Sequence, residues 1–228
     1  MKSIQLFAIV ILIVAFTSCS LFKSTYYNEL NEEEKKKYTP MFLDLENHES
    51  NTDGVYSLNI DEFRTLLKNS SNKLNFINFY RIYCQGNHDM LKDFSEKFDL
   101  YKFDRYFISG NDWVYKNDYL EIIENSSISR FYLLDVNKYG HLDEGWHDGI
   151  TFFERNQAFY NDLRKVSVLD SNENKEYSYP NIMICDNDSN ILLEFDPNGC
   201  DGKENCFENE DTFYNSLDSL LNSKLSLE

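Results

Sequence analysis

Short hydrophobic runs alternate with amphipathic stretches along the chain from residue 55 onward. The run VYSLN (55–59) predicts a strand, and the following segment (60–70) places Phe63, Leu66 and Leu67 at helical spacing behind Asn59, a suitable N-cap residue. The segment KLNFINFYRIY (73–83) is rich in apolar and aromatic residues and contains no proline, which predicts a strand buried on both faces. Strands that alternate with helices in this way are typical of an α/β sheet with parallel members.

The same alternation continues to the C-terminus. Two apolar runs flank the turn-forming cluster DNDSN (186–190), which predicts a hairpin over 179–195. Pro180 stands at the start of its first strand, where the missing N–H group does no harm. The other predicted elements are a helix through Leu91, Phe94 and Phe98, a strand at 104–110, a strand that ends in a turn at 129–140, and helices at 117–125, 152–166 and 211–225.

The first residues have the pattern of an export signal. Lys2 is followed by an apolar stretch, Ile4 to Phe16, of about 13 residues, which is shorter than the roughly 20 residues that a helix needs to cross a bilayer. The run VAFTSC (14–19) resembles a bacterial lipobox, in which cleavage precedes a cysteine that becomes lipidated; an ordinary cleaved signal is the alternative. We therefore predict a signal peptide at 1–18, a lipidated N-terminus and linker at 19–54 that begins with Cys19, and one domain at 55–228. The domain is expected outside the cytoplasm, anchored by lipid in a bacterial cell envelope.

The charge balance limits the partners. The chain carries 39 acidic and 22 basic residues, for a net charge of −17. Such a surface repels nucleic acid and anionic lipid headgroups. We therefore expect no nucleic-acid partner, and we expect the acyl anchor rather than charge to hold the protein at the membrane.

Export changes what the cysteines mean, because disulfides persist outside the cytosol. Of the five cysteines, Cys19 is assigned to lipidation, and the other four allow three pairings. Cys200 and Cys206 stand six residues apart in a glycine- and acid-rich loop, and we expect them to form a disulfide. Cys185, between Ile184 and Asp186 in a predicted strand, is expected to be a buried core thiol. This assignment leaves Cys84 and Cys185 free, and a disulfide between Cys84 and a distant cysteine is an alternative.

The ordered set of elements resembles the thioredoxin fold. VYSLNIDEFRTLLKNSSNKLNFINFY (55–80) is similar to the opening strand, helix and central strand of that family, and YCQGNH (83–88) stands where the family has its Trp-Cys-x-x-Cys turn. SRFYLLDVNKYG (129–140) is similar to the extra strand of the TlpA/ResA-like extracytoplasmic branch, and YPNIMICDNDSNILLEF (179–195) to the cis-proline strand and its partner. The resemblance covers about 55–223. It implies an α/β thioredoxin-like fold, a central mixed sheet flanked by helices, with an insertion at 141–177 before the cis-proline strand.

The resemblance also assigns roles around Cys84. Cys84 takes the position of the nucleophile, Tyr83 replaces the family's tryptophan, and Asn87 replaces the resolving cysteine. A cysteine at a helix N-terminus faces unsatisfied N–H groups that favour the thiolate, and a charged His88 would add to this effect. Because Asn87 cannot resolve a mixed disulfide, the predicted activity is monothiol–disulfide exchange at Cys84 with thiols of envelope proteins.

Pro180 takes the position of the proline that the family holds in cis beside the thiol. The resemblance implies that Tyr179 and Pro180 form the wall against which a partner peptide docks. The alternative from another class is a non-catalytic binding module on the same scaffold, in which Cys84 only packs as a small hydrophobe.

A copper-binding chaperone is the third interpretation. Cys84 and His88 are four residues apart, which places both on one face if a helix begins there. One extracytoplasmic branch of the thioredoxin fold binds copper through two cysteines and a remote histidine; by this resemblance His88 takes the second cysteine position, and His141 or His147 supplies the remote ligand. One thiolate and two imidazoles suit copper. The preferred interpretation requires no metal and no cofactor.

Overall fold

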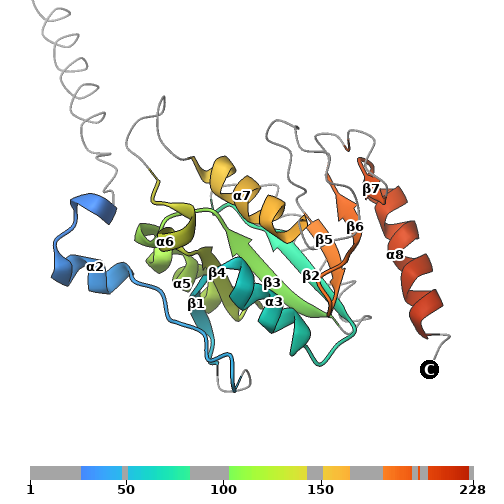
Figure 1. The fold of residues 1–228 in the computed structure, drawn as a ribbon, viewed down its shortest axis with the longest axis horizontal. Helices are drawn as coiled ribbons and strands as arrows, with labels where there is room; N and C mark the ends of the chain where they lie inside the picture. Colours follow the sequence, from blue (N-terminus) through green and yellow to red (C-terminus); the bar gives the residue numbers. More distant parts are fainter. Residues whose placement is uncertain are drawn as a thin grey trace, which may run out of the picture.

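The computed structural model describes residues 27–47, 51–82, 103–142, 151–164, 182–196, 200 and 205–225. Within these residues the chain forms a seven-stranded mixed sheet with helices on both faces (Figure 1). The strands are β1 (Gly54–Leu58), β2 (Leu74–Phe79), β3 (Asp104–Ser109), β4 (Arg130–Leu134), β5 (Ile182–Asp186), β6 (Ile191–Phe195) and β7 (Cys206–Phe207). The helices are η1 (Tyr27–Glu29), α2 (Glu32–Tyr38), α3 (Ile60–Lys68), η3 (Trp113–Tyr115), α5 (Lys116–Asn125), α6 (Val136–Tyr139), α7 (Phe152–Arg164) and α8 (Glu210–Leu225).

The strand order in the sheet is β1-β4-β3-β2-β5-β6-β7. β1, β4, β3 and β2 run parallel, whereas β5 is antiparallel to both of its neighbours, and β7 pairs parallel with β6. The predicted α/β class, with a central mixed sheet and flanking helices, is therefore confirmed. The thioredoxin-like topology with its insertion stays a prediction, since most of the insertion (143–150 and 165–177) lies outside the described residues.

Alternate strand residues fill two hydrophobic cores, one on each face of the sheet. In β4, Phe131 and Leu133 belong to the core beneath α5 and α8, and Tyr132 and Leu134 belong to the core beneath α3 and α7. Every residue of β2 is buried, as the apolar run at 73–83 predicts. A strand buried on both faces needs helices on both sides, so the sheet is the middle of three layers.

The helix after β1 begins where the sequence predicts. The side chain of Asn59 accepts hydrogen bonds from the backbone N–H groups of Asp61 and Glu62, both at 3.0 Å, and the Glu62 carboxylate accepts one from the Asn59 N–H at 2.8 Å. This reciprocal capping box satisfies N–H groups that have no partner inside the helix. It fixes the first turn of α3, whose buried face then covers β1 and β2 in the α3–α7 core.

The segment 129–140, predicted as a strand that ends in a turn, forms the strand β4 followed by a short helix. β4 ends at Leu134, and Asp135 caps the short helix α6 by accepting a hydrogen bond from the Asn137 N–H at 3.1 Å. Gly140 follows with a φ of 74°, a conformation that glycine adopts without strain. The polar residues after Leu134 therefore turn the chain away from the sheet instead of extending the strand.

Part of the segment predicted as a linker packs on the domain. Tyr27 and Leu30 are buried in the α5–α8 core, and the Lys116 ammonium donates a hydrogen bond to the Thr39 carbonyl at 2.8 Å. Met41 forms an isolated parallel bridge beside β1, where its N–H donates to the Val55 carbonyl at 2.9 Å. Among the described residues, none of the helices has the length and apolar content needed to cross a bilayer.

Candidate functional site

The carboxyl ends of the four parallel strands meet at one edge of the sheet, which is the usual place for a site in an open α/β sheet. β2 ends at Phe79, and the next residue stays attached to the sheet because the Tyr80 N–H donates to the Ile108 carbonyl at 2.8 Å. Tyr80 is fully buried and Ile82 is 7% exposed. Ile82 is the last described residue before Cys84, which follows it by two positions in the sequence.

The strand that follows Pro180 in the sequence begins at the same edge of the sheet. β5 is antiparallel to β2, and Ile182, its first residue, lies opposite Asn78. Ile182 is also the first described residue after Pro180. The strand that leads toward Cys84 and the strand that follows Pro180 are therefore neighbours in the middle of the sheet.

The predicted thiol site itself lies outside the described residues. This holds for every residue assigned a role by the resemblance to thioredoxins and for the lipidation site. The predictions for these residues, including a cis bond before the proline, stay predictions. The residues concerned are Cys19, Tyr83, Cys84, Asn87, His88, Tyr179 and Pro180.

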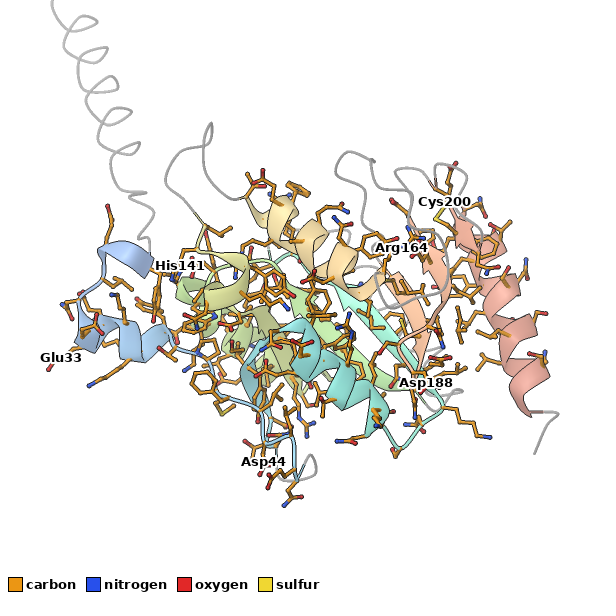
Figure 2. The ribbon with its side chains drawn as sticks, in the orientation of Figure 1. Glu33, Asp44, His141, Arg164, Asp188 and Cys200 are labelled. Atoms are coloured by element: carbon orange, nitrogen blue, oxygen red, sulfur yellow. A yellow bond between two sulfur atoms is a disulfide. The ribbon has the colours of Figure 1, made fainter. Side chains whose placement is uncertain are left out.

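Three other cysteines have described environments. Cys200 and Cys206 form a disulfide, as predicted, with their Cα atoms 5.5 Å apart, and Cys200 lies close to the first turn of α8 (Figure 2). Cys185 is fully buried in β5, which confirms the prediction of a core thiol. Its burial, with smaller contributions from Glu194 and Asp186, raises the pKa of the Cys185 thiol well above its usual value. A thiol in this state is a poor nucleophile.

A cationic and aromatic surface lies beside the end of β2. The Arg81 guanidinium is stacked over the rings of Phe152 and Phe153, 5.5 and 5.3 Å from their centroids. Phe153 is 45% exposed, although large aromatic side chains are usually buried. These residues come from the β2 end and the first turn of α7. We call them the Arg81 surface.

His141 is held by a buried carboxylate at the end of β3. The Asp112 Oδ2 atom lies 3.1 Å from the His141 Nδ1 atom and accepts a hydrogen bond from the Leu142 N–H at 3.0 Å. The ring of Tyr27 is stacked on the imidazole, with centroids 4.7 Å apart, so the N-terminal segment covers one face of His141 (Figure 2). Of the histidines in the copper interpretation, His88 and His147 lie outside the described residues. His141 is already engaged through Nδ1 and one ring face.

Arg155, like Asp112, is a polar residue at this edge that the sequence does not identify as part of a site. Its side chain is fully buried, and its guanidinium donates to the Gly110 carbonyl at 2.8 Å and to the Leu134 carbonyl. These carbonyls stand at the ends of β3 and β4. Burial lowers the pKa of Arg155 to about 10, although Asp112 and Asp135 oppose the shift. Because the arginine joins two neighbouring strand ends, its role here is structural.

A buried hydrogen bond also ties α7 to β6. The Tyr160 hydroxyl donates to the Glu194 Oε1 atom at 2.7 Å, and Glu194 is only 3% exposed. Burial, followed by the charge of Glu194, raises the pKa of Tyr160. β6 runs in the same direction as β2, so Glu194 and the buried Asp196 bring negative charge to the edge that carries the candidate site.

Comparison of the chain with protein-family models, with curated proteins and with solved structures gives no match. The sequence identified Cys185, Cys200 and Cys206 correctly from their positions. It missed Asp112 and Arg155, because a single polar residue in a turn or on a helix carries no signal that a distant carbonyl or imidazole is its partner.

Proposed function

We propose that this chain is an exported, lipid-anchored protein with a thioredoxin-like scaffold that performs monothiol–disulfide exchange at Cys84. Its partners would be thiols and disulfides of proteins in a bacterial cell envelope. The observation that carries the proposal is the pairing of β2 with β5, with Ile182 opposite Asn78. The pairing supports the proposal because, in the sequence, β2 precedes Cys84 and β5 begins two residues after Pro180.

The cysteine inventory favours a single-thiol mechanism. Cys200 and Cys206 are consumed by their disulfide, and Cys185 is buried with a raised pKa. Cys19 is assigned to lipidation, so Cys84 is the remaining cysteine of the five in the sequence. No second thiol of this chain is assigned to resolve an intermediate on Cys84.

The proposed reaction balances without a second protein thiol. The Cys84 thiolate attacks one sulfur of a partner disulfide, a mixed disulfide forms, and the other partner sulfur leaves as a thiolate. Asn87 carries no sulfur, so a thiol of the partner or of a small molecule has to attack the mixed disulfide and regenerate the Cys84 thiolate. The net result is an exchange of disulfides in which no electrons are gained or lost.

Alkylation of the full-length protein in detergent tests the nucleophile. We expect Cys84 to react with iodoacetamide in the native state, with a midpoint pH well below about 8.5, the value for a free thiol. Cys185 should stay unmodified until the protein is unfolded, because it is fully buried. Labelling of Cys84 only after denaturation would reject thiol exchange.

Trapping in cells identifies the partner. A disulfide-linked complex should appear when free thiols are blocked in intact cells, and Cys84→Ser should abolish it. Cys185→Ala is the matched control, because it removes a thiol that is buried and should leave the complex unchanged. Loss of the complex in both variants would point to a folding defect, which circular dichroism of the purified variants would reveal.

One observation favours the second candidate, a non-catalytic peptide-binding module. The Arg81 surface presents an exposed aromatic ring and a guanidinium beside the end of β2. Such a surface can hold a peptide through stacking and charge without thiol chemistry. If the module proposal is correct, partner capture should survive Cys84→Ser and be lost in the double variant Arg81→Gln, Phe153→Ser.

A further inference from the structure

A cavity of about 370 Å³ opens at the amino edge of β3 and β4, the edge opposite the candidate thiol site. Its volume falls in the range of about 300–1,000 Å³ that is typical of small-molecule sites. Its polar lining comes from the first residues of the two strands and from the loop that precedes β4. The residues that matter for its chemistry are Asp104, Arg105, Tyr106, Ser129, Arg130 and Tyr132.

Two buried hydrogen-bond donors in this lining have no partner among the described residues. Tyr106 is 2% exposed, and its hydroxyl makes no hydrogen bond. The Nε–H group of Arg130 is likewise buried and unpaired, although the same guanidinium donates to the Asn51 carbonyl through Nη2. A buried donor without an acceptor calls for an explanation, and here two of them belong to residues that line one cavity.

The hydroxyl of Tyr106 remains a donor over a wide pH range. Burial, the neighbouring Tyr132 and Asp104 raise the pKa of Tyr106 well above its usual value, and Arg130 only partly offsets this. An arginine Nε–H group can donate but cannot accept. The occupant must therefore offer acceptor atoms to both groups.

The charge of the lining selects the kind of acceptor. Arg130 brings a positive charge to the lining, and Asp104 brings a negative one. Both carboxylate oxygens of Asp104 are already engaged, one by the Asn72 side-chain amide at 2.9 Å and the other by the Ser70 hydroxyl. The Arg130 guanidinium, in contrast, keeps its Nε–H group unpaired. Guanidinium groups match the geometry of carboxylate and phosphate groups.

We infer that the cavity at the amino edge of β3 and β4 binds a small oxyanion through Arg130 and Tyr106. The anion accepts hydrogen bonds from the Arg130 Nε–H group and the Tyr106 hydroxyl, and the Tyr132 ring forms part of the wall. The inference does not depend on the thiol proposal, because this cavity lies at the other edge of the sheet.

Calorimetric titration of the full-length protein in detergent tests the inference, with sodium phosphate and sodium acetate as the probes at constant ionic strength. We expect saturable binding of one anion per chain with a Kd of about 10 mM or tighter. The probe with the lower Kd shows whether the site prefers a phosphate or a carboxylate group. Arg130→Gln should weaken binding about tenfold or more, and Tyr106→Phe should weaken it several-fold.

Two matched variants control for general effects. Tyr56→Phe removes a hydroxyl that donates to the Thr52 carbonyl at 2.7 Å and does not line the cavity. Arg64→Gln removes a guanidinium on α3. Both should bind the anion as the wild type does. No saturable binding of either probe to the wild type would mean that the cavity holds solvent only and would overturn the inference.

The inference can still be tested if either Arg130→Gln or Tyr106→Phe fails to fold. Unchanged affinity in both Arg130→Gln and Tyr106→Phe would overturn the inference even if the wild type bound an anion. Tyr106→Phe keeps the ring that packs on Phe63, with centroids 5.5 Å apart, so it is expected to fold even if Arg130→Gln does not. In that case, the affinity of Tyr106→Phe alone decides: a several-fold loss supports the site, and an unchanged Kd rejects it.

Discussion

Replacement of Arg155 by methionine tests the strongest structural claim at the carboxyl edge, that one buried guanidinium joins the ends of two strands. Methionine keeps an unbranched chain of similar length but donates no hydrogen bond. In the wild type, the Arg155 side chain is fully buried and bonds to the carbonyls of Gly110 and Leu134. The variant would leave both carbonyls without this donor.

Two opposing terms set the size of the effect. A hydrogen bond from a charged donor contributes about 1.5–3 kcal/mol, so two contribute about 3–6 kcal/mol. Against this, burial lowers the pKa of Arg155 from 12.5 to about 10. Because one pKa unit corresponds to about 1.4 kcal/mol, a pKa lowered by about 2.5 means that burial of the charge costs about 3.5 kcal/mol, which the variant recovers. At the middle of their range the two bonds outweigh this cost by about 1 kcal/mol, and we expect a loss of about that size.

Urea unfolding followed by far-ultraviolet circular dichroism measures this loss, provided that the m value is unchanged. Arg64→Met is the matched control, because Arg64 is 28% exposed, and water can replace its hydrogen bond to the Asp162 carbonyl. We expect the control to lose less than about 0.5 kcal/mol. An Arg155→Met protein as stable as the wild type would show that the cost of burying the charge cancels the two bonds, and the reasoning would be refuted.

Three further predictions concern the stability of the domain. Replacing both Cys200 and Cys206 by serine should lower the free energy of unfolding by about 2 kcal/mol, as expected for a short closed loop, and a reductant should produce the same loss in the wild type but none in the variant. Phe63→Ala should cost about 3–5 kcal/mol in a urea titration because the ring is fully buried, whereas Phe153→Ala, at a 45% exposed position, should cost less than about 1 kcal/mol. Burial raises the pKa of Tyr132 to about 12. The protonated Tyr132 hydroxyl therefore stabilises the folded state fully below about pH 10, which is the pKa of tyrosine in the unfolded chain. This stabilisation is lost as the pH rises from about 10 to 12. The unfolding free energy should fall over this interval, and Tyr132→Phe should make the fall smaller; an equal fall in both proteins would contradict the assignment.

Local signals in the sequence predicted the elements that depend on local physics. Asn59 predicted the start of α3, because the capping interaction involves residues only two and three positions away. The turn cluster at 186–190 predicted the β5–β6 hairpin for the same reason: the Asp186 side chain accepts from the Asn190 N–H at 2.8 Å. The turn predicted at the end of 129–140 takes the form of the short helix α6, and its Asp135 cap is also a local interaction.

Properties that depend on long-range pairing could not be predicted. The insertion of β4 between β1 and β3 is not visible in any segment taken alone. The Arg155 bonds join residues 45 and 21 positions apart in the chain. The contact of His141 with Asp112 spans 29 positions, so the sequence offered His141 as a metal ligand. A polar residue reveals its partner only after the sheet has brought the two together.

Buried carboxyl groups at the carboxyl edge of the sheet work against a reactive thiol at Cys84. Asp112, Glu194 and Asp196 are buried carboxyl residues on elements that end at this edge, and negative charge there opposes formation of a thiolate. Glu194 already contributes to the raised pKa of Cys185. A reactive Cys84 would therefore need stabilisation from nearby helix N–H groups, from His88 or from cations such as Arg81. A low alkylation midpoint would show that local donors outweigh the surrounding carboxylates, whereas a high one would leave the Arg81 surface as the feature that best explains partner binding.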